Sequence, residues 1–142
     1  MIIPFQPWHA EAMKVRDVEL GPEFGNRALY AIQNGPAVSV IAADERVIAS
    51  FGMIWIVGRT AEVWALVSRD APRYAKTLHK AAFWAIGEAH RRHGIRRFQA
   101  AIAEDKTTAR RWIARLGFAP ESALPLFGPK GETFYRYVRF MP

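Results

Sequence analysis

The apolar residues between positions 107 and 118 recur with the spacing of an amphipathic helix. Positions i, i+3, i+4 and i+7 of this stretch are Ala109, Trp112, Ile113 and Leu116. A helix of 3.6 residues per turn places such positions on one stripe, which is expected to pack on a sheet. Three arginines are expected on the opposite, solvent-facing side: Arg110, Arg111 and Arg115.

Both ends of this helix carry their own signals. Asp105 or Thr107 can accept a hydrogen bond from a free N–H of the first turn, which predicts an N-terminal cap. Gly117 can adopt the left-handed conformation that closes a helix, and Phe118 is then expected to pack back on the last turn. A strand is predicted to follow Phe118 directly.

The rest of the chain alternates between helical and strand-like periods. Helices are predicted over residues 7–19, 24–33 and 73–92. Strands are predicted over residues 1–5, 37–43, 47–57, 61–67, 98–103 and 132–140, and a loop over residues 120–129. The longest helix is expected to bury a stripe that comprises Leu78, Ala82, Ala85, Ile86 and Ala89. The apolar run 98–103 is typical of a central strand buried on both faces.

The resulting order is β-α-α-β-β-β-α-β-α-β-β. It predicts one α/β domain over residues 1–142, with a mixed central sheet and helices on both faces. The composition is 51% hydrophobic, which suits a packed globule. The absence of cysteine excludes disulfides, thiolate metal sites and a cysteine nucleophile, and it fits a reducing compartment. We find no signal peptide and no membrane span, so we expect a cytoplasmic protein.

The net charge of +7 is high for this length. A basic surface of this size attracts polyanions such as nucleic acid, although solubility is the commoner reason for it. The charges are spread along the sequence, apart from a cluster at residues 90–97. His90 and His93 have a spacing compatible with metal binding, but no third ligand is evident, and we predict no metal site.

The wording Ala-x-x-Trp-Ile-x-x-Leu-Gly-Phe at residues 109–118 resembles the GNAT superfamily of N-acyltransferases, and the element order extends this resemblance to nearly the whole chain. The resemblance implies the GNAT fold, acetyl-CoA as the cofactor and an amine as the acyl acceptor. It also implies that the strand 61–67 pairs with the pantetheine arm and that the following helix receives the pyrophosphate, which a helix N-terminus favours. The cofactor-binding residues implied are Leu66, Val67, Ser68, Arg73, Tyr74, Ala75 and Lys76.

Several motif positions depart from the family pattern. Residues 71–77 lack the glycines that let backbone N–H groups approach the phosphates, which leaves Arg73 and Lys76 as point charges. Ile113 stands where the family often has a tyrosine acid, and Lys106 stands at the asparagine position. In these departures, and in the motif at residues 127–137, the chain resembles the GNAT-like proteins of tailed bacteriophages. That branch includes the internal virion protein A type.

Acyl transfer to an amine needs a base for the ammonium, an oxyanion donor and an acid for the leaving thiolate. The candidate base is Glu62 on the cofactor-side strand or Glu104 at the end of a buried strand. Tyr135 or Tyr137 could replace the missing acid, and a backbone N–H near residues 66–68 would serve the oxyanion. A solvated glutamate and ordinary aromatic packing are the plainer interpretations.

Three functional hypotheses therefore remain open. The first is an acetyl-CoA-dependent N-acyltransferase with degenerate motifs. The second is a catalytically inactive phage structural or ejection-associated protein, which would contact other virion proteins and lie in the host cytoplasm or the virion. The third is a polyanion-binding module that uses the basic surface.

Overall fold

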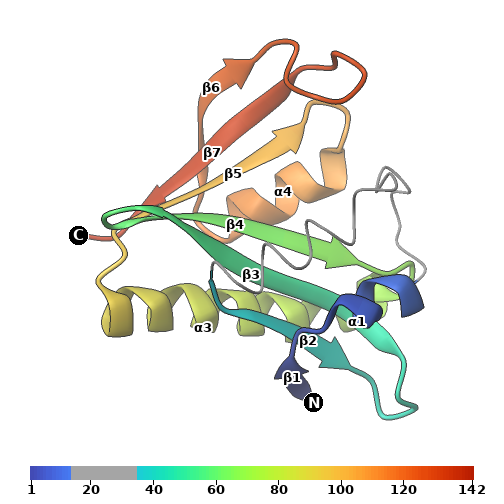
Figure 1. Ribbon diagram of the computed structural model, residues 1–142. Coiled ribbons are helices and arrows are strands. Elements are labelled where there is room, and N and C mark those ends of the chain that lie inside the picture. Colours follow the sequence, from blue (N-terminus) through green and yellow to red (C-terminus); the bar gives the residue numbers. More distant parts are fainter. Residues whose placement is uncertain (14–34) are drawn as a thin grey trace. The chain divides into compact units, whose positions relative to one another are not determined.

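The computed structural model describes residues 1–13 and 35–142 (Figure 1). Its strands are β1 (Ile2–Pro4), β2 (Ala37–Ile41), β3 (Val47–Val57), β4 (Thr60–Val67), β5 (Arg97–Ala103), β6 (Ala119–Leu124) and β7 (Phe134–Phe140). Its helices are α1 (Pro7–Ala12), the 3₁₀ helix η1 (Ala71–Tyr74), α3 (Ala75–His93) and α4 (Thr107–Arg115). The helix predicted at 24–33, and residues 14–19 of the first predicted helix, lie outside the described residues.

The strands form one seven-stranded mixed sheet in the order β1-β2-β3-β4-β5-β7-β6. The pairs β1–β2, β2–β3, β5–β7 and β6–β7 are antiparallel, and β4 pairs with β5 in parallel. This arrangement confirms the predicted α/β class and the mixed sheet. The chain divides into two compact units, Met1–Trp55 with Val63–Ala82 and Ile56–Glu62 with Phe83–Pro142. Each unit is described separately below.

The first unit is built on the predicted hairpin of β2 and β3. Ser39 lies opposite Ser50 in the register, and Glu45 turns the chain with a φ of 69°. Both serines are fully buried, and the hydroxyl of Ser39 lies 2.7 Å from that of Ser50 and 2.8 Å from Nδ1 of His9. Burial lowers the pKa of His9, which disfavours the charged form of the imidazole in this core.

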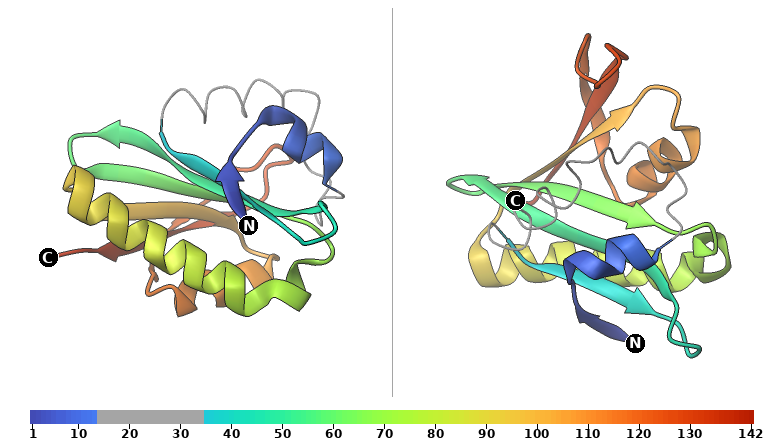
Figure 2. Two further views of the ribbon diagram at one scale, coloured as in Figure 1. Left: turned by 90° about the horizontal axis from the view of Figure 1, so that it is seen from below. Right: turned by 45° about the vertical axis from the view of Figure 1, so that its right-hand side comes forward.

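Gly52 marks the tightest approach in this hairpin. A Cβ at position 52 would lie 2.7 Å from the carbonyl oxygen of Pro36 and 2.8 Å from both Ala37 and Trp64. Real Cβ atoms do not come this close to backbone, so only glycine fits here. Gly52 lies on β3, and the second view in Figure 2 shows β1, β2 and α1 beside that strand.

In the second unit, α4 ends as its sequence predicts and begins differently. Gly117 has a φ of +93°, the amide of Phe118 donates to the carbonyl of Ile113 at 3.2 Å, and Phe118 is buried. The N-cap is Lys106, and no side chain caps the helix, so the predicted cap at Asp105 or Thr107 is wrong. Backbone turns already hold this end, because the amide of Thr107 donates to the carbonyl of Asp105.

Two positions on α4 also differ from the predicted stripe. Ala109 is exposed because it lies in the first turn, ahead of the buried Ile113. Arg110 was expected in solvent, yet it is half-buried because its guanidinium donates two hydrogen bonds toward β5 and β7.

The strand β6 follows Phe118 directly, as predicted, but it extends to Leu124, into the segment 120–129 that was predicted to be a loop. Five of its six residues are exposed, and it contains a proline and no β-branched residue, so residues 120–124 carry no strand signal. Pairing with β7 forms the strand instead, with Ala119 opposite Val138 and Leu124 opposite Phe134. Pro120 is tolerated because β6 is the last strand of the sheet, where a missing N–H need not break a ladder.

The strand β5 is not fully buried on either face, although burial on both faces was predicted. Phe98, Ala100 and Ala103 are buried, while Gln99 and Ala101 are half-buried. Successive side chains of a strand face opposite sides of the sheet. Phe98 and Ala100 are therefore buried on one side of the sheet and Ala103 on the other, while Gln99 and Ala101 stay partly accessible.

Candidate active site

A carboxylate and a phenol meet at the carboxyl end of β5. Glu104 follows the last residue of β5, and Tyr135 lies on β7 opposite Ile102. The hydroxyl of Tyr135 donates to Oε1 of Glu104 at 3.2 Å, and the amide of Glu104 donates to the carbonyl of Thr133 at 3.0 Å. Glu104 is exposed and Tyr135 half-buried, so both groups are accessible to a substrate. The structure thus brings together one of the two candidate bases and one of the two candidate acids.

Arg110 holds this pair from α4. Its Nη1 donates to the backbone carbonyl of Glu104 at 2.9 Å, and its guanidinium carbon lies 5.0 Å from the ring centroid of Tyr135. Its Nε donates to the hydroxyl of Tyr137 at 2.9 Å, and this hydrogen bond raises the pKa of Arg110. A permanent positive charge therefore lies beside a carboxylate and two phenols.

Sequence reasoning missed Arg110. The available signal was its spacing, because Arg110 precedes the buried Ile113 by three residues and so borders the buried face of α4. Tyr137, the alternative acid, is buried, and its hydroxyl already accepts the hydrogen bond from Arg110. Tyr135 is therefore the phenol that a substrate can reach.

Glu62 lies elsewhere along the sheet. It stands opposite Gln99 in the parallel pairing of β4 and β5, and Nε2 of Gln99 donates to its Oε2 at 2.8 Å. Glu104 lies five residues farther along β5, which is about 16 Å at 3.3 Å per residue. The structure does not bring Glu62 to Glu104 and Tyr135.

The end of β4 belongs to the first unit. The side chain of Leu66 packs against two core clusters there, and Val67 is half-buried. Ser68 is buried, its amide donates to the carbonyl of Ile48 at 2.9 Å, and its hydroxyl accepts from the amide of Asp70 at 3.2 Å. The amide of Ser68 already donates a hydrogen bond within the fold, so it is no oxyanion donor. Of the residues 66–68 predicted to supply that donor, Leu66 and Val67 remain.

The backbone between β4 and α3 is also largely committed. The amide of Ala71 donates to Ser68, that of Arg73 donates to Asp70, and that of Ala75 donates to Pro72. Pro72 has no N–H. The start of α3 therefore offers few backbone donors to a pyrophosphate, in keeping with its lack of glycine.

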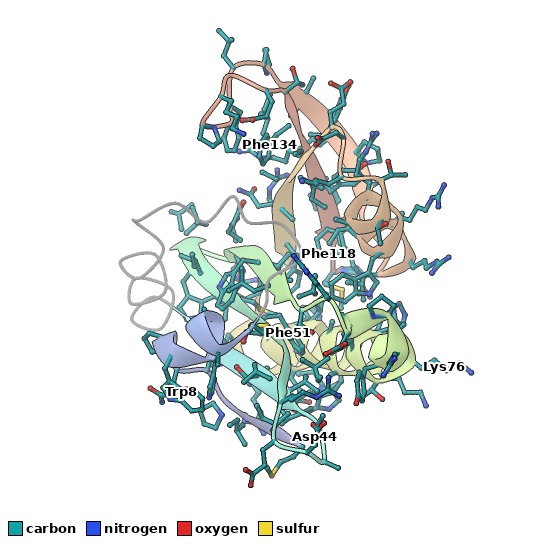
Figure 3. All side chains as sticks on the ribbon, turned by 90° about the vertical axis from the view of Figure 1, so that its right-hand side faces the viewer. Trp8, Asp44, Phe51, Lys76, Phe118 and Phe134 are labelled. Atoms are coloured by element: carbon teal, nitrogen blue, oxygen red, sulfur yellow. The ribbon has the colours of Figure 1, made fainter. Side chains whose placement is uncertain are left out.

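Side chains remain for that task. Arg73 and Lys76 are exposed, Tyr74 is half-buried and Ala75 is exposed without a polar side chain. Figure 3 shows Lys76 projecting from the first turn of α3. Arg46 adds no free charge here, because it is paired with Asp44 at 2.6 Å and with Asp70 at 2.5 Å. The residues present therefore fit a phosphate by charge rather than by a backbone cradle.

Metal binding and membrane crossing have no support in the part of the chain that the structure describes. No group of three histidine, aspartate or glutamate side chains could hold a metal there. His90 is explained by local structure, because its Nδ1 lies 2.8 Å from the carbonyl oxygen of Ile95. Within the same residues, no helix combines the length and apolar composition needed to cross a membrane.

Comparison by sequence gives no match, either to a protein-family model or to a curated protein. Comparison by structure gives many. A putative phosphinothricin N-acetyltransferase matches with a TM-score of 0.77 and 15% identity, covering 100% of this chain and 98% of that one. Ribosomal-protein-S5-alanine acetyltransferase from Vibrio fischeri matches with a TM-score of 0.75 and 12% identity, covering 98% and 91%.

A third solved structure is a GNAT-family acetyltransferase from Bacillus anthracis. It matches with a TM-score of 0.71 and 16% identity, covering 98% of this chain and 93% of that one. Identities this low speak for the fold alone. The chain has the GNAT fold.

Proposed function

We propose that this GNAT-fold chain is an N-acyltransferase that takes its acyl group from acetyl-CoA. The observation that carries the proposal is the hydrogen-bonded pair of Glu104 and Tyr135, held by Arg110 at the carboxyl end of β5. Ligand sites of α/β sheets open at the carboxyl ends of strands. The structural neighbours named as acetyltransferases support the same class of reaction.

The two groups divide the proton transfers between them. Glu104 accepts a proton from the acceptor ammonium, which makes the amine nucleophilic. Acetyl-CoA, when bound, supplies a thioester whose C–S bond breaks as the new C–N bond forms. Tyr135 donates its proton to the leaving sulfur and recovers one from Glu104 through the hydrogen bond that joins them. The second amine proton passes to solvent.

The cofactor would be held in the first unit by the cations at the start of α3. Arg73 and Lys76 would meet its phosphates, and the backbone of Leu66 and Val67 would meet its pantetheine arm. The committed amides of Ala71, Arg73 and Ala75 support weak binding, because point charges replace a backbone cradle.

Calorimetric titration with acetyl-CoA and an assay for thiol release test the proposal. The chain has no cysteine, so every free thiol detected comes from the cofactor. We expect binding that the double variant R73E/K76E weakens, and thiol release with an amine panel that E104Q and Y135F strongly reduce. The control E62Q should keep its activity. No binding at millimolar acetyl-CoA would overturn the proposal.

A second candidate is a non-catalytic structural protein of a phage virion that retains the GNAT scaffold. The committed amides before α3 favour it, as does Ile113, which is buried at the position of the family's acid and cannot donate a proton. A structural role predicts that the wild-type chain unfolds cooperatively, binds no acetyl-CoA and releases no thiol. Measured turnover that depends on Glu104 would exclude it.

A further inference from the structure

A groove lies at the amino-terminal end of β5, within the second unit. It is open to solvent, has a volume of about 390 Å³ and is lined by Arg59, Thr60, Arg96, Arg97, Phe140, Met141 and Pro142. We propose that this groove binds single-stranded nucleic acid, taking one unstacked base with its phosphate. The proposal is independent of the acyl transfer proposed above, because none of these residues belongs to that site.

Backbone hydrogen bonds build the groove from three segments far apart in the sequence. The carbonyl of Arg59, in the β3–β4 turn, accepts from the amides of both Arg96 and Arg97, at 2.9 and 3.1 Å. The amide of Met141 donates to the carbonyl of Arg96 at 2.8 Å. Figure 1 shows the carboxyl terminus beside the β3–β4 turn and the start of β5. The arginines are therefore presented from fixed neighbouring positions.

Three arginines line the groove, and they differ in how far their charges are already paired. Arg97 donates to both carboxylate oxygens of Glu121, at 2.9 and 2.6 Å, so this pair is neutral. Arg96 gives its Nε to the carbonyl of Met141 at 3.4 Å, which leaves its terminal nitrogens and its charge. Arg59 and Arg96 are exposed, so two guanidinium groups face an incoming anion. A phosphate is the anion that planar guanidinium groups bind best.

An aromatic ring supplies the second half of a nucleotide site. Phe140 is 64% exposed at the end of β7, and the guanidinium carbon of Arg97 lies 5.6 Å from its ring centroid. Exposed aromatic rings next to arginines stack on unpaired bases, whatever the base. A duplex hides those base faces, so the ring favours single strands.

The groove is remote from the proposed acyl-transfer residues. Arg97 and Glu104 are seven residues apart at opposite ends of β5, roughly 23 Å at 3.3 Å per residue. Binding at one end is therefore expected to leave the other accessible.

Fluorescence polarisation with a short labelled oligothymidylate tests the proposal on the full chain. We expect R59E/R96E to weaken binding at least about tenfold and to reduce its salt dependence. We expect F140A to weaken it about fivefold or more, because one stacked base is lost. The controls are R111E/R115E, which makes the same charge change on α4, and L126A, which removes another exposed apolar side chain.

The competing outcomes are clear in the same assay. Equal weakening by R59E/R96E and R111E/R115E would show general electrostatic attraction and overturn the groove. Tighter binding of the matching duplex would overturn the role of Phe140. Competition by free thymidine monophosphate as strong as by the oligonucleotide would identify a small nucleotide instead of a strand. Thermal unfolding of each variant checks that it is folded.

Discussion

The two ends of β5 use arginine in opposite ways. At the carboxyl end, Arg110 donates hydrogen bonds to the hydroxyl of Tyr137 and to the backbone carbonyl of Glu104, so it positions these residues. At the amino end, Arg59 and Arg96 are exposed and project from backbone that is tied together by the Arg59 carbonyl. The number of arginines therefore says little about function. The hydrogen-bond partners of each guanidinium group decide whether it positions other site residues or is free to bind a ligand.

The largest expected effect separates the two ends by chemistry. E104Q should lower kcat about 100-fold, because an amide cannot accept the ammonium proton. Binding of the oligothymidylate should stay unchanged, and R59E/R96E should show the reverse pattern. Steady-state thiol release and fluorescence polarisation on the same protein samples measure both. Loss of both activities in either variant would contradict the separation of the two ends.

The next effect tests whether Arg110 positions the pair. R110A should lower kcat about tenfold with little change in the acceptor KM, because the substrate touches Glu104 and Tyr135 rather than Arg110. R111A is the matched control on the same helix and should resemble the wild type. If R110A raised KM and left kcat unchanged, Arg110 would be a substrate ligand instead.

A smaller effect concerns the neutralised arginine of the groove. E121Q should tighten oligothymidylate binding about threefold, because Arg97 loses its partner and regains a charge for phosphate. The slope of log affinity against log salt should steepen by about 0.7 for the additional phosphate contact. The control is E132Q, which removes a carboxylate elsewhere in the unit. Unchanged binding in E121Q would place Arg97 outside the ligand site.

The smallest effect is a pH dependence of stability. The hydrogen bond from Arg97 lowers the pKa of Glu121, so the folded state favours the charged carboxylate. This stabilisation is complete above the ordinary glutamate range and is lost as pH falls through the lowered pKa. Melting temperatures of wild type and E121Q should therefore differ near neutral pH and converge in acid. A gap that persists in acid would show a cause other than this ion pair.

Much of the fold could be predicted because its signals are local. The β-branched residues on both sides of a short polar turn predict the hairpin 37–57. The left-handed conformation open to Gly117 predicts the end of α4. The start of β6 was predicted but its length was not, since an exposed edge strand that contains a proline is held by its pairing with β7. Chain-local patterns cannot report a hydrogen-bond partner that lies on another strand.

The candidate site was predictable in its types of residue and not in their grouping. Glu104 and Tyr135 were both expected as candidates, but 31 residues separate them, and only the β5–β7 register brings them into contact. Glu62 was an equal candidate by sequence and lies elsewhere. Arg110 was assigned to solvent, because no spacing rule shows that Tyr137 would accept its hydrogen bond.

The sequence by itself determined the α/β class, most of the strands and helices, and the lack of glycine at residues 71–77, where α3 begins. These depend on side-chain periodicity and backbone preference, which act over a few residues. The tertiary structure alone decided which arginines are occupied, which amides remain as donors and which carboxylate meets a phenol. Those properties depend on contacts between segments distant in the chain, where burial and hydrogen-bond geometry choose among chemically similar residues.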